Sequence, residues 1–153
     1  MSVSDDTVWI GGREHAWRLP LDVLALGQAL AAMRQAACRY SASAPARVEL
    51  LLVRDGDMAR YNRDAMGCTG PTNILSFPPA EAEADGREEY GDLPEMPGSL
   101  ILSVDAVYRE AFLFRQQPRE HLLRLLAHGM GHLCGLDHGP EMDSLCDKIL
   151  NYQ

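Results

Sequence analysis

One stretch holds three of the five histidines of this 153-residue chain: Ala127-His128-Gly129-Met130-Gly131-His132-Leu133-Cys134-Gly135-Leu136-Asp137-His138. His128 and His132 are four residues apart, so on a helix they lie on one face, about one turn apart. Gly135 suits the left-handed conformation that ends many helices, and beyond that turn His138 can supply a third imidazole. Three protein ligands with an open fourth position are typical of a catalytic zinc site. The stretch therefore predicts a zincin-like metal helix, with His128, His132 and His138 as ligands.

The spacing is that of the extended zincin motif H-E-x-x-H-x-x-G-x-x-H, with one change. Residue 129 is Gly, where the zincin proteases carry the Glu that acts as general base. The pattern thus predicts a metal site without the usual protease chemistry. The alternative is that the histidines only cap or fill a core helix, and the positions of the Gly and the third His disfavour it.

Two segments of the chain resemble the signatures of a known family. H-G-x-x-H-L-x-G-x-D-H resembles that of the YbeY family of zinc-dependent endoribonucleases and rRNA-maturation factors, and Pro71-Thr72-Asn73-Ile74-Leu75-Ser76-Phe77-Pro78 resembles its second signature, T-[DN]-V-L-S-F-P. The resemblance runs from about Arg47 to the C-terminus. It implies one zinc ion per chain, an endoribonuclease that acts in rRNA maturation and ribosome assembly, and RNA and ribosomal components as partners. It also implies an α/β fold with the zinc site in a cleft.

Composition is that of a globular domain, with 46% hydrophobic and 24% charged residues. The length predicts one domain over residues 1–153. No apolar run approaches the roughly 20 residues that span a membrane, and no basic segment followed by an apolar one opens the chain. The four cysteines form no C-x-x-C pair, which favours free thiols in a reducing compartment. We therefore expect a cytoplasmic protein without a membrane partner.

The net charge of −8 argues mildly against binding to nucleic acid. Residues 81–95, however, hold seven acidic residues and one basic residue, and account for −6 of that charge. The rest of the chain is near neutral, so a local basic cleft fits the composition. We expect an exposed acidic loop at about 80–97.

Hydrophobic periodicity predicts an α/β (α+β) fold in which one small mixed β-sheet is covered by helices. Strands are expected at 7–10, 47–53, 73–77 and 99–103, and helices at 20–39, 55–65, 105–116, 118–133 and from 140 onward. Pro118 and Pro140 suit the first turns of the last two helices.

Three residues near the proposed ligands have expected roles of their own. His121 lies about 10 Å before His128 along the helix axis, too far to share the ion, and is expected to be partly exposed at the rim of the cleft. Cys134 is expected in the core rather than at the metal. Asp137 can bond the second N–H of a metal-bound imidazole or cap the last helix, and the sequence leaves both open.

Gly129 and Gly131 each cost about 1 kcal/mol in a helix relative to Ala. Either they clear room beside the metal for a bulky substrate, or they allow close packing against a neighbouring helix.

The chain departs from the family upstream of the second signature. When the family pattern N-x-x-Y-R is aligned at Asn62, Met66 stands at the position of the Arg. Arg60 and Arg63 are close enough to bind RNA phosphates in its place, although a shifted Arg is not equivalent at a phosphate-binding site. Further departures are Gly98-Ser99-Leu100 in place of G-D-I, and Cys146 where the family often has Glu.

The expected reaction is hydrolysis of RNA by a water whose pKa the metal lowers toward about 7. No residue stands out as general base, and Asp137 can serve only if it reaches this water. One alternative is a non-catalytic, zinc-containing ribosome-assembly factor, which the changes at Met66 and Ser99 favour. The other is a zinc peptidase with Glu141 as general base.

Overall fold

The computed structural model describes residues 7–79 and 96–152. The acidic loop expected at about 80–97 lies outside this range up to residue 95. In order, the elements are β1 (Val8–Gly11), the 3-10 helix η1 (Arg13–Arg18), α1 (Val23–Tyr40), β2 (Val48–Val53), α2 (Asp55–Met66), β3 (Ile74–Phe77), β4 (Gly98–Ser103), α4 (Val104–Leu113), α5 (Pro118–Leu133) and α6 (Pro140–Leu150). The expected helices and strands are all present with small shifts at their ends, and η1 is additional. No helix in the described ranges is long and apolar enough to cross a membrane.

The described strands form one mixed sheet in the order β1-β2-β4-β3. β1, β2 and β4 are parallel, and β3 pairs antiparallel with β4, with Ile74 opposite Leu102 and Phe77 opposite Ser99. The predicted mixed sheet is therefore confirmed. β3 lies at the edge of this sheet, with β4 as its one neighbour among the described strands.

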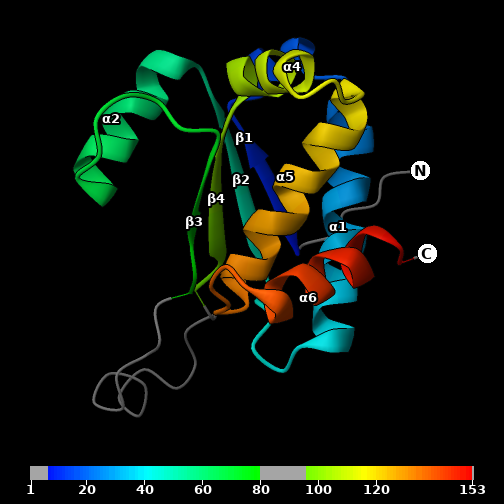
Figure 1. Ribbon diagram of the computed structural model, residues 1–153. Coiled ribbons are helices and arrows are strands. Elements are labelled where there is room, and N and C mark those ends of the chain that lie inside the picture. The colour runs from blue at the N-terminus through cyan, green and yellow to red at the C-terminus, as the bar shows by residue number, and fades with distance from the viewer. Residues whose placement is uncertain (1–6, 80–95, 153) are drawn as a thin grey trace.

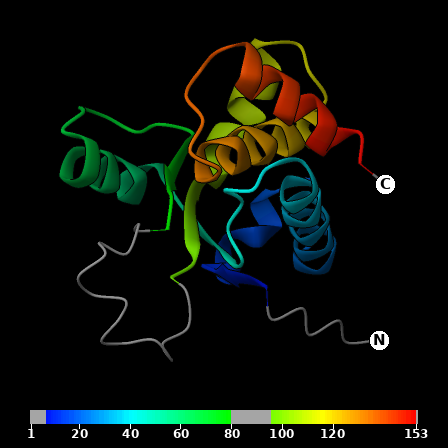
Figure 2. The same ribbon diagram turned by 90° about the horizontal axis from the view of Figure 1, so that it is seen from below.

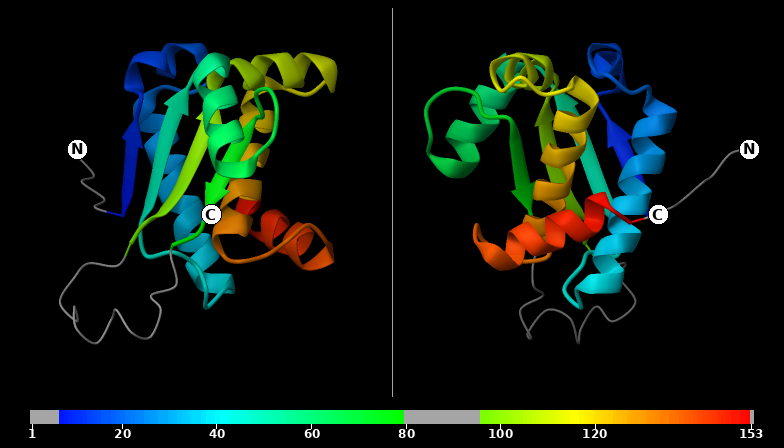
Figure 3. Two further views of the ribbon diagram at one scale, coloured as in Figure 1. Left: turned by 90° about the vertical axis from the view of Figure 1, so that its left-hand side faces the viewer. Right: turned by 45° about the vertical axis from the view of Figure 1, so that its right-hand side comes forward.

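Helices cover both faces of the sheet (Figures 1 and 2). α1 and α5 pack on one face, over the main core, which includes the fully buried Leu26, Leu30, Leu50, Leu100 and Leu126. α2 lies on the opposite face, over a smaller cluster of Val53, Met58, Leu75 and Ile101. α6 crosses the C-terminal end of α5 and also contacts α1 (Figure 3).

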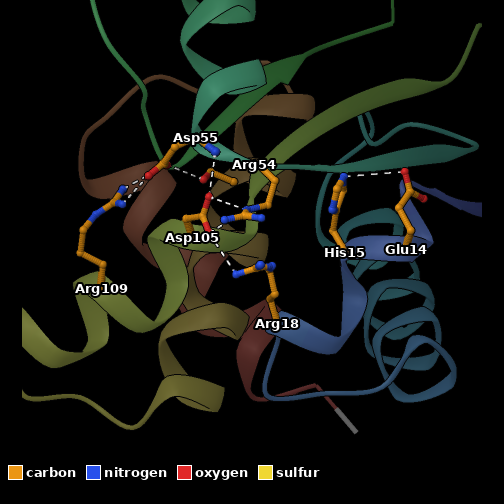
Figure 4. Close-up of polar contacts among 8 residues, drawn as sticks. Glu14, His15, Arg18, Arg54, Asp55, Asp105 and Arg109 are labelled. Carbon is orange, nitrogen blue, oxygen red and sulfur yellow. Dashed lines mark hydrogen bonds and ion pairs between the residues drawn. The ribbon is translucent and has the colours of Figure 1, made fainter.

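Charged side chains join the N-terminal ends of α2 and α4 at the edge where the parallel strands end (Figure 4). Asp105 accepts hydrogen bonds from Arg54 Nε at 2.9 and 3.0 Å and from the backbone N–H of Asp55 at 2.9 Å. Asp55 accepts from the Ser103 hydroxyl at 2.8 Å and pairs with Arg109. Burial favours a higher pKa for Asp105, but these hydrogen bonds outweigh it and hold the pKa below its ordinary 3.8. The network fixes how both helices leave the sheet.

Candidate metal centre

The C-terminal half of α5 presents the first two histidines at the surface. Leu122, Leu125 and Leu126 face the core, which leaves His128 and His132 half-buried on the outer side of the helix. α5 ends at Leu133, and Gly135 adopts φ +85°, the left-handed turn that the sequence predicted. The chain reverses there and brings the exposed His138 back to the other two.

The three rings face one another and form the three-histidine centre: His128, His132 and His138. One ring nitrogen of each lies within 4.8 Å of the others, and the Nε2 atoms of His128 and His132 are 3.1 Å apart. A tetrahedral ion with bonds of about 2.0–2.1 Å would hold two ligand nitrogens about 3.3 Å apart. His132 Nδ1 lies 2.9 Å from the Leu136 carbonyl, which can only accept, so the proton is on Nδ1 and the Nε2 lone pair faces the centre. This donor set fits a single divalent cation.

The electrostatics of the centre favour the neutral form of His128. Burial lowers the pKa of His128 below its ordinary 6.5, and the charges of His132 and His138 act in the same direction. A neutral imidazole is the form that binds a metal. Asp143, exposed in the first turn of α6, acts on His128 in the opposite direction. The sequence does not single out Asp143, because nothing local shows that α6 folds back against α5.

The two glycines between the ligands are sites of close packing. A Cβ at Gly129 would lie 2.9 Å from Leu100 Cδ2 and 3.0 Å from Ile74 Cδ1, and one at Gly131 would lie 2.5 Å from Met142 Sδ. The packing alternative is therefore correct, and the idea that these glycines clear room for substrate is wrong. On the side of Gly129 the neighbours are the strands β3 and β4 rather than a helix, so β3 lies against α5 beside His128.

His121 is buried, and the prediction of a partly exposed residue at the rim is wrong. Its Nε2 lies 2.9 Å from Glu110 Oε1 on α4, and its Nδ1 lies 3.2 Å from Gln116 Oε1. α4 packs against α5 at this point and supplies a carboxylate that the sequence spacing did not reveal. His121 is not among the histidines that the structure groups at the centre. Cys134 is 4% exposed, so its predicted place in the core is confirmed.

Asp137 is exposed and makes no hydrogen bond or ion pair with residues 7–79 and 96–152. The carbonyl of Leu136, the residue before it, is the group that bonds His132. α6 begins after Gly139 without a side-chain cap. The structure thus shows neither of the contacts that the sequence suggested for Asp137.

The structure does not bring Arg60 and Arg63 to the histidines. α2 lies on the opposite face of the sheet from α5 (Figure 2), and there Arg60 pairs with Asp57 and Arg63 with Asp64. Met66 is exposed at the end of the same helix.

Arg124 is a basic residue near the centre that the sequence reasoning missed. It is exposed, lies four residues before His128 on the same face of α5, and makes no hydrogen bond or ion pair within the described ranges. The four-residue spacing was visible in the sequence, but whether Arg124 was exposed or paired was not.

The chain is similar to several known proteins. A family described as "Endoribonuclease YbeY" matches residues 21–151. The endoribonuclease YbeY of Nitratidesulfovibrio vulgaris is 45% identical, over 84% of this chain and 83% of its own, and that of Lawsonia intracellularis is 39% identical over 91% of each. The solution structure of TM1509 from Thermotoga maritima shares the fold, with a TM-score of 0.57 at 20% identity, covering 94% of this chain and 86% of that one.

The fold and the three-histidine centre define a metal-dependent hydrolase. The matches are more specific, and the chain belongs to the YbeY endoribonuclease family. The resemblance carried by the two sequence motifs is thereby confirmed.

Proposed function

We propose that this chain is a zinc-dependent endoribonuclease of rRNA maturation, with His128, His132 and His138 as the ligands of one zinc ion. The observation that carries this is the 3.1 Å separation of two imidazole Nε2 atoms, with a third ring beside them, in a chain of this family. Imidazole is a common zinc ligand, and three protein ligands leave one position open for chemistry. Ribosomal components are the expected partners.

When bound, zinc would supply a Lewis acid that lowers the pKa of water and polarises a phosphoryl oxygen. The chain itself orients its donors, since the Leu136 carbonyl holds the His132 ring. The first turn of α6 packs against α5, with Met142 beside Gly131, and Asp143 in that turn is a carboxylate whose charge acts on His128. We propose Asp143 as the general base that would accept a proton from the attacking water. Asp143 suits this role better than Asp137, because no electrostatic or hydrogen-bond contact links Asp137 to the ligands within the described residues.

A nearby cation is needed to stabilise charge that develops on the phosphate. Arg124 is better placed for this than Arg60 or Arg63, because it shares the face of α5 that carries His128 and has no carboxylate partner in the described residues. Arg124 would also supply the positive charge that is missing in this chain, where Met66 stands at the position of the family's arginine.

Elemental analysis and a cleavage assay test this function together. Protein purified without chelator should contain about one zinc per chain, and should cut a structured rRNA fragment but not casein. Chelator should abolish cleavage, and zinc should restore it. A folded chain with almost no metal would refute the centre. Metal without RNA cleavage would favour the non-catalytic assembly factor, and casein hydrolysis would favour the peptidase.

A further inference from the structure

The outward side of α4 is apolar where a surface helix is usually polar. Its inward residues, Val104, Ala106, Val107 and Ala111, are buried. Its outward residues include Tyr108 at 47%, Phe112 at 85% and Leu113 at 65% exposed, and Phe114, which follows the helix, is 60% exposed. A run of three large exposed apolar side chains is unusual unless it binds something.

Arginine side chains accompany these aromatic residues. Arg109 and Arg115 are both exposed; Arg109 pairs with Asp55, and the side chain of Arg115 makes no hydrogen bond or ion pair in the described part of the chain. The acidic residues of α4 are turned elsewhere, because Asp105 bonds Arg54 and Glu110 lies against His121. We call Tyr108, Arg109, Phe112, Leu113, Phe114 and Arg115 the α4 surface. It is aromatic and basic, in a chain whose net charge is −8.

We propose that the α4 surface binds single-stranded RNA next to the segment that is cleaved, a step that rests on the RNA-cleaving function proposed above. Bases would stack on Tyr108, Phe112 and Phe114, and Arg115 would contact a phosphate. Aromatic side chains bind bases without regard to sequence, and arginine adds to this affinity. An aromatic surface that includes the unpaired Arg115 complements single-stranded RNA, because bases stack on the rings and the arginine attracts a phosphate.

α4 lies at the N-terminal end of α5 (Figure 1), and His128 and His132 lie in the C-terminal half of α5. His128 is ten residues after Pro118, which is about 15 Å along the helix axis. Arg124 lies between them on the outer face of α5. A stacked strand rises about 3.4 Å per nucleotide, so the length of α5 from Pro118 to His128 corresponds to about four to five nucleotides.

Fluorescence anisotropy with a labelled 12-nucleotide single-stranded RNA tests this binding. The full chain is kept in chelator, so that the RNA stays intact. Phe112→Ala should weaken binding about tenfold, as expected for the loss of one stacked base. Arg115→Ala should weaken binding and lower the slope of log affinity against log salt by about 0.7. The matched controls, Leu24→Ala and Arg39→Ala, remove an exposed apolar and an exposed basic side chain from α1 and should bind as the unsubstituted chain does.

RNA length gives an internal control, because a four-nucleotide RNA bound at the histidines is too short to reach α4. Its affinity should therefore be the same for Phe112→Ala and for the unsubstituted chain. Equal binding of the 12-nucleotide RNA by Phe112→Ala and its control, with cleavage intact, would overturn the RNA-binding role of α4 and leave the proposed function standing. An unsubstituted chain that neither binds nor cuts RNA would overturn both. Light scattering adds a further criterion. If Phe112→Ala converts a dimer to a monomer without changing RNA affinity, the α4 surface is a protein interface and the inference is wrong.

Discussion

Metal affinity at the three-histidine centre should fall steeply below neutral pH, because protons compete with the metal for neutral imidazole. Independent imidazoles with a pKa near 6.5 would each cost about tenfold in affinity per pH unit below that value. Here burial, with the charges of His132 and His138, lowers the pKa of His128, so His128 stays neutral to lower pH. Its Nε2 is also 3.1 Å from that of His132, which leaves little room for a proton on both. We therefore expect fewer than three protons to be released on binding below pH 6.5, and so a loss of less than about 1000-fold in affinity per pH unit.

Competition with a chromophoric zinc chelator at several pH values from 5 to 7.5 would measure this slope. His121→Ala is the matched control, because His121 is buried outside the centre and should leave the slope unchanged. A slope of three would show that the pKa of His128 is not lowered. Affinity that does not change with pH would indicate carboxylate ligands and refute the choice of histidines.

Three further predictions concern ligands, RNA contact and thiol chemistry. By elemental analysis, His132→Ala should lose the metal and His121→Ala should keep it. Thermal denaturation should show that His121→Ala loses about 1–3 kcal/mol of stability, because Glu110 on α4 is left without this partner. In RNA-binding titrations, Arg124→Ala should weaken affinity at unchanged zinc content and lower the salt slope by about 0.7, and Arg63→Ala, on the other face of the sheet, should have the smaller effect. Burial raises the pKa of the Cys146 thiol to about 11, so mass spectrometry should find it unmodified by iodoacetamide at pH 8 until the protein is unfolded.

The sequence by itself determined what depends on neighbours along the chain. Two histidines four residues apart share a helical face, and a glycine three residues later allows the left-handed turn, so the geometry around His128, His132 and Gly135 follows from local backbone conformation. Hydrophobic periodicity likewise located the strands and helices, because burial of one face imposes a repeat on neighbouring residues. Asp22 shows the limit of this, since its side chain caps α1 and the helix begins at Val23, later than the periodicity alone indicates.

Only the tertiary structure decided which segments lie side by side. It placed α2 on the sheet face opposite α5, so Arg63 lies on the other side of the sheet from the helix that carries His128 and His132 (Figure 2), and it packed α6, which carries Asp143, against α5. It buried His121 against a carboxylate on α4 and packed Gly129 against two strands. These contacts join residues far apart in the chain, and their energies depend on how helices and sheet fit together in three dimensions. No periodicity within one segment carries that information. For this reason the sequence correctly placed the three histidines close together but did not reveal their surroundings.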